Sequence, residues 1–121
     1  MILLMLVAGG LGAVARFLLD GLIRLRLRDS VGIATSVINV TGSVVLGLFA
    51  GLIAAHVVPP TWHMVVGTGF FGGYTTFSTA SYETVRLAQS GRLGRAMAHA
   101  ASTAVLCLVG AAAGYALGLW L

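Results

Sequence analysis

The chain has 121 residues, of which 59% are hydrophobic and only 8% are charged, and its mean hydropathy is +1.02. A soluble domain of this length could not bury so much apolar surface, so the composition predicts an integral membrane protein. The net charge of +4 comes from arginines, since the chain has no lysine. Because they gather in short connecting segments, they indicate membrane topology and argue against a nucleic-acid partner.

Four apolar stretches each approach the roughly 20 residues that a membrane helix needs. They cover about 2–23, 33–56, 62–86 and 96–120. The connections between them are short, and no residues remain for a soluble domain. We therefore predict an all-α integral membrane protein, with residues 1–121 forming one domain of four transmembrane helices.

Charged residues outside these stretches predict the orientation. Three arginines (Arg24, Arg26, Arg28) lie in the first connection, and three more (Arg86, Arg92, Arg95) lie in or beside the third. The second connection and both termini have none. The positive-inside rule then places both termini outside the cell membrane, although the same arginines can also bind lipid head groups.

The first stretch holds two ionisable residues at membrane depth. Arg16 and Asp20 are one helical turn apart, on the face that also carries Gly9 and Ala13. Pairing would lower the cost of burying them, so we expect a structural ion pair; direct ion conduction is the alternative.

The second stretch carries a polar stripe of Thr35, Asn39 and Ser43, one every four residues. Asn39 can both donate and accept hydrogen bonds. Bonding between helices and lining of an ion path are equally compatible with this spacing.

The fourth stretch has a polar half and a glycine half on one face. Its polar residues are His99, Thr103 and Cys107, and its glycines are Gly110, Gly114 and Gly118. The glycines predict close packing against another helix. His99 is expected to be a packing residue near the interface, with a pH-sensitive role as the alternative.

The third stretch is unusual because the glycine pair Gly72-Gly73 is followed by a run of hydroxyl side chains from Thr75 to Thr84. We expect the helix to break at the glycine pair. In hydrocarbon such a break is tolerated only inside protein or beside a filled cavity, and its free carbonyls can hold a small cation.

Glu83 is the one acid in the third stretch, and Arg86 is its expected partner. The chain shows no paired catalytic carboxylates, no serine–histidine–acid set and no phosphate-binding loop. The sequence therefore predicts no enzyme.

At these motifs the chain resembles the Fluc (CrcB) fluoride channels of microbes. The matching motifs are Gly9-Gly10-x-Gly12-Ala13-x-x-Arg16, Asn39-x-x-Gly42-Ser43 and Gly69-x-x-Gly72-Gly73-x-Thr75-Thr76-Phe77-Ser78-Thr79. The third motif is specific to the family, whereas the fourth stretch is similar only in its general character and has no matching motif.

The resemblance implies passive export of fluoride through an antiparallel dimer with two pores and a central, structural sodium ion. The sodium ligands map onto the backbone carbonyls of Gly72 and Thr75. The pore residues map onto Asn39, Phe77, Thr35, Thr103 and His99, and a structural role maps onto Arg16. Amide and hydroxyl groups would replace the water of fluoride, assisted by the positive edge of an aromatic ring.

Two features depart from the family pattern. Ala80 stands where similar proteins have a second phenylalanine, and the loop charges are strongly asymmetric. A homodimer of opposed subunits needs a chain that inserts both ways, so we hypothesise pairing with an oppositely oriented paralogue, with one pore impaired.

Two rival functions remain. Small four-span exporters of drug cations rely on a glutamate in the first span, where this chain has Arg16 and Asp20. A non-conducting structural subunit is favoured by Ala80.

Overall fold

The computed structural model describes residues 1–27 and 32–121. Three of its helices are long and apolar enough to cross a membrane, namely α1 (Ile2–Arg26), α2 (Ile33–Ala54) and α6 (Leu93–Trp120). They confirm the first, second and fourth apolar stretches, with ends that differ by a few residues. Arg28, one of the arginines assigned to the first connection, lies outside the described residues.

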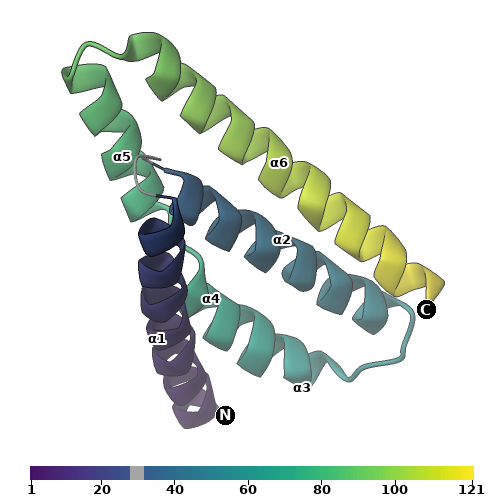
Figure 1. The fold of residues 1–121 in the computed structure, drawn as a ribbon. Coiled ribbons are helices and arrows are strands. Elements are labelled where there is room, and N and C mark those ends of the chain that lie inside the picture. Colours follow the sequence, from purple (N-terminus) through teal and green to yellow (C-terminus); the bar gives the residue numbers. More distant parts are fainter. Residues whose placement is uncertain (28–31) are drawn as a thin grey trace.

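The third apolar stretch does not form a single helix. It is divided into α3 (Pro60–Trp62), the π-helix η1 (His63–Phe71), α4 (Gly72–Tyr74) and α5 (Ser78–Gln89). Figure 1 shows the connection between α4 and α5 near the middle of the molecule, from which α5 runs to the turn that leads into α6. The expected interruption is therefore present, and the described part of the chain contains no β-strand.

The position of the interruption differs from the expectation. Gly72 and Gly73 are both helical, and the chain leaves the helix at Thr75, whose backbone is extended with φ −80° and ψ 158°. Gly73 serves helix packing, because a Cβ there would overlap the carbonyl of Gly9 in α1. The break thus follows the glycine pair.

The α2 and α6 helices form the most extensive packing in the molecule. Glycines on both helices bring the backbones together: a Cβ at Gly47 would overlap the carbonyl of Ala111, and one at Gly114 would overlap that of Val44. The predicted glycine face of α6 is therefore confirmed as a helix-packing surface.

Much of the single chain's surface is apolar and exposed. On α1 the exposed side chains include Leu3 (72%), Leu6 (67%) and Phe17 (77%). Apolar surface of this extent needs lipid or a protein partner to cover it.

Candidate ion pathway

Asn39 is the residue that holds the interrupted helix to α2. Its side-chain Nδ2 donates to the carbonyl of Thr76 at 2.7 Å, and its Oδ1 accepts from the amide of Thr76 at 2.8 Å. The amide side chain thereby satisfies both backbone polar groups of one residue inside the break. Asn39 therefore bonds α2 to the interrupted third stretch, and the second hydrogen on its Nδ2 is still available as a donor.

At the break, two backbone carbonyls lose the amide groups that would bond to them in a continuous α-helix. In a continuous α-helix the amide of Thr76 would bond to the carbonyl of Gly72 and that of Thr79 to the carbonyl of Thr75. Instead Thr76 donates to Asn39, and Thr79 donates to the side-chain Oγ1 of Thr76 at 3.1 Å. The carbonyls of Gly72 and Thr75 therefore lack their helical amides, and these are the two oxygens that the family resemblance implies as sodium ligands.

A cavity of about 610 Å³, called the wide cavity below, lies beside the break. Its walls come from α2, the 75–77 connection, α5 and α6. The lining includes Asn39, Ser43, Thr75, Thr76, Phe77, Ala80, Ser81, Thr84, His99, Thr103 and Cys107. No arginine or carboxylate is among the described lining residues.

Four of the five predicted pore residues line this cavity: Asn39, Phe77, His99 and Thr103. Thr103 is 9% exposed, and its hydroxyl lies 2.9 Å from that of Ser36. Thr35 is not among the lining residues. These placements show proximity to a cavity, while conduction by these residues stays a prediction.

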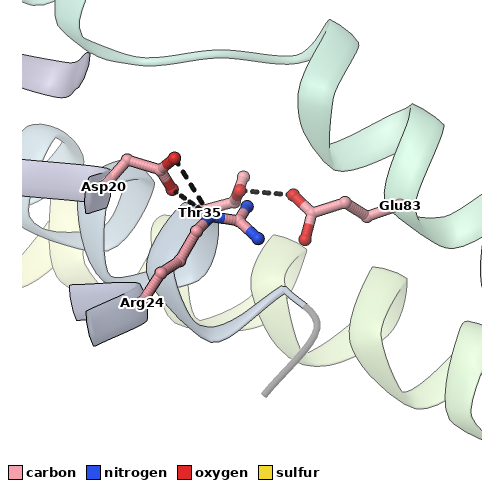
Figure 2. Close-up of polar contacts among 4 residues, drawn as sticks. All are labelled: Asp20, Arg24, Thr35 and Glu83. Carbon is pink, nitrogen blue, oxygen red and sulfur yellow. Dashed lines mark hydrogen bonds and ion pairs between the residues drawn. The ribbon is translucent and has the colours of Figure 1, made fainter. Parts of the chain in front are cut away.

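Thr35 instead hydrogen-bonds an acid on a different element. Its Oγ1 donates to Oε1 of Glu83 (Figure 2). Glu83 is 6% exposed, and its Oε2 is buried with no partner in the described part of the chain. The expected pairing of Glu83 with Arg86 is wrong: Arg86 contacts Tyr82, with Nη1 3.4 Å from the hydroxyl and the guanidinium 5.8 Å from the ring centre. The sequence feature that could have indicated the Thr35–Glu83 contact is that both are polar residues within apolar stretches, where each needs a hydrogen-bond partner.

The expected ion pair between Arg16 and Asp20 is also absent. Asp20 accepts from Nε of Arg24, 3.0 Å from each carboxylate oxygen (Figure 2). An acid one turn before a base is the better order along a helix, and Asp20–Arg24 has this order whereas Arg16–Asp20 reverses it. Arg16 Nε is buried without a partner among the described residues, and Arg16 lines a smaller cavity of about 180 Å³.

Phe77 supplies an aromatic ring to the lining of the wide cavity, and Ala80 supplies none. Phe77 is 86% exposed at the break, so the described residues leave most of its side chain uncovered. Ala80 lines the wide cavity, and the nearby rings do not replace the missing one. Phe70 stacks on Tyr74, whose hydroxyl lies 3.0 Å from that of Thr41; neither ring lines the wide cavity.

Comparison with known proteins places the chain in a family. The family described as "CrcB-like protein, Camphor Resistance (CrcB)" matches residues 3–115. The chain belongs to the CrcB family. Its members are ion channels and not enzymes, in agreement with the absence of a catalytic set in the sequence.

Several CrcB relatives are similar over nearly their full length. The "Fluoride-specific ion channel FluC 1" of Leifsonia xyli subsp. xyli is 53% identical over 120 residues, which cover 99% of this chain and 85% of the relative. The FluC 2 protein of Cutibacterium acnes is 48% identical over 113 residues, covering 92% and 91%. The FluC protein of Acidobacterium capsulatum is 40% identical over 111 residues, covering 91% and 89%. With three membrane-length helices, this CrcB protein is a multi-pass membrane protein.

Proposed function

We propose that this chain is a fluoride channel subunit that lowers cytoplasmic fluoride by passive export across the cell membrane. The names of the CrcB relatives support this substrate. The observation that carries the proposal is the Asn39–Thr76 contact, which holds a broken membrane helix beside a hydroxyl-lined cavity. No described carboxylate lines that cavity to repel an anion.

Fluoride enters such a path when protein donors replace its water. The free Nδ2 hydrogen of Asn39 and the hydroxyl of Thr103 are available donors, and the edge of the Phe77 ring adds a weak positive field. Thr35 contributes none, because its hydroxyl proton is donated to Glu83. Several weak sites in series suit conduction, since one tight site would trap the ion.

A structural sodium ion fits the break. Backbone carbonyls freed by an unwound membrane helix are suitable sodium ligands, and the carbonyls of Gly72 and Thr75 both lack their helical amides. Gly72 is also open to its surroundings, with no atom within 4 Å of where a Cβ would stand. The ion would stabilise the break without being transported.

The functional unit is proposed to be an antiparallel dimer. The exposed Phe77 ring and the exposed Gly72 are accessible to a second subunit. The loop arginines favour one insertion direction, with both termini outside, so the favoured partner is an oppositely oriented paralogue. A homodimer is the alternative. In the heterodimer, Ala80 would impair one of the two pores.

Fluoride efflux from liposomes tests the function. The chain is reconstituted alone and with the paralogue, and efflux is compared with that of protein-free liposomes. Fluoride release with retention of chloride supports the proposal, whereas no release in either preparation contradicts it. A sided reporter on each terminus tests the pairing, because equal populations in two orientations would contradict a heterodimer.

The two rivals are separated by the same assay. A proton-coupled exporter of drug cations needs an ionisable acid, so Glu83→Gln would abolish its transport, whereas fluoride flux survives because the amide oxygen can still accept from Thr35. A non-conducting subunit, favoured by Ala80, would give no flux alone and leave the partner's flux unchanged.

A further inference from the structure

His99 lies where the wide cavity meets the first turn of α2. Its ring contacts Gly32, the N-cap residue of α2, which has a left-handed φ of 90°. A Cβ at Gly32 would lie 2.6 Å from Nδ1 of His99, so the ring packs directly against this glycine. The same side chain lines the wide cavity.

Hydrogen-bond partners for the His99 ring are scarce among the described residues. Nε2 of His99 is buried and has no hydrogen-bond partner among residues 1–27 and 32–121. Protonation makes both ring nitrogens donors, and the N-terminus of α2 presents the positive end of its helix dipole. A protonated ring therefore has to turn toward the cavity to find water or an anion.

Among the described residues, few other titratable or charged groups lie on the elements around the ring. The described part of α2 has none. On α5 the acid Glu83 is bonded to Thr35 and is absent from the cavity lining, as is the exposed Arg86. On α6 itself, Arg95 is exposed one turn earlier, and Cys107 is the other titratable residue of the lining.

We propose that His99 is a proton-dependent anion-binding residue of the wide cavity. The neutral ring packs against Gly32, and the protonated ring turns into the cavity and becomes the one cation among its described lining residues. Because no described carboxylate lines the cavity, the permeating anion is the available counter-charge. This inference rests on the proposed function, since it names the regulation of the same pathway.

The experiment measures fluoride efflux at about pH 7.5 and about pH 5.5, on either side of the ordinary histidine titration. The chain is used with its paralogue if flux requires it, and protein-free liposomes correct for neutral hydrogen fluoride that crosses lipid unaided. We expect the fluoride concentration for half-maximal flux to fall at the lower pH by about threefold or more, as charge-assisted hydrogen bonds are the stronger ones. His99→Gln removes this pH dependence. The matched variant His56→Gln, in the exposed turn after α2, retains it.

A wild type whose half-maximal fluoride concentration is independent of pH would overturn the inference, and so would a His99→Gln variant with the pH dependence of the wild type. A protein without flux at either pH would contradict the proposed function instead. For a protein without flux, the inference is tested by NMR. The pH dependence of the His99 ring signal is measured, and this signal is identified as the one that the His99→Gln variant lacks. Fluoride in place of a large organic anion should raise the pH midpoint of this signal, and an unchanged midpoint overturns the inference.

Discussion

Asn39 satisfies both backbone polar groups of Thr76, accepting from its amide at 2.8 Å and donating to its carbonyl at 2.7 Å. One side chain of α2 thus performs the hydrogen bonding that a continuous third helix would have performed for itself. The contact leaves the carbonyl of Gly72 without its helical amide and places Asn39 on the wall of the wide cavity. Asn39 therefore both supports the break and lines the candidate ion path.

Replacing Asn39 by alanine should lower stability and abolish fluoride flux together. Each buried backbone group left unpaired costs about 1–3 kcal/mol, and two groups of Thr76 lose their partner. The measurements are the free energy of unfolding in detergent and fluoride efflux from liposomes. Ser43→Ala is the matched control, because Ser43 lines the same cavity one helical turn away and has no side-chain hydrogen bond among the described residues. An Asn39→Ala protein with the efflux of the wild type would contradict the pore assignment.

Replacing Phe77 by alanine should reduce flux with little effect on the stability of the single chain. The ring is 86% exposed, so its removal creates no internal cavity, and surface changes are usually within about 0.5 kcal/mol. Leu108→Ala serves as the control, since Leu108 is 73% exposed on α6 and does not line the wide cavity. Normal efflux in Phe77→Ala would exclude the ring from the ion path.

Replacing Ala80 by phenylalanine should increase flux through this subunit if the missing ring impairs its pore. The wide cavity, at about 610 Å³, has room for the added ring. Ala100→Phe adds the same ring from the part of the wall that α6 forms, where it is expected to obstruct the path. Efflux is measured for both variants at equal reconstituted density. Equal or lower efflux in Ala80→Phe would remove the argument for an impaired pore.

Replacing Gly114 by alanine should separate α2 from α6 and destabilise the protein by about 1–3 kcal/mol, the usual cost of overpacking. The new Cβ would overlap the carbonyl of Val44 and lie 2.9 Å from the amide of Leu48. Gly94→Ala, on the same helix with no atom within 4 Å of the new Cβ, should be neutral or stabilising by up to about 1 kcal/mol. Thermal unfolding in detergent compares the two. Equal melting temperatures would show that the α2–α6 contact tolerates a wider spacing.

Local sequence features were sufficient to predict much of this fold. Hydropathy over about 20 residues identifies α1, α2 and α6, because each of these helices satisfies its own backbone and needs only an apolar surface. The glycine spacing of α6 likewise predicted a packing face. Four of the five pore candidates, which came from the family resemblance, line one cavity, and their role in conduction stays a prediction.

The contacts between elements could not be obtained in this way. Two acids were given the wrong partner: Asp20 pairs with Arg24, and Glu83 with Thr35 across 48 residues of sequence. The break was expected at Gly72-Gly73 and occurs at Thr75.

The sequence by itself determined that this chain is an all-helical CrcB membrane protein with an interrupted third apolar stretch, since hydropathy and glycine motifs act within single segments. Only the tertiary structure decided where the interruption falls and which polar groups are free for an ion. The physical reason is that a buried hydrogen-bonding group takes the partner that folding brings within reach, and Asn39, Thr35 and Glu83 each found theirs outside their own helix.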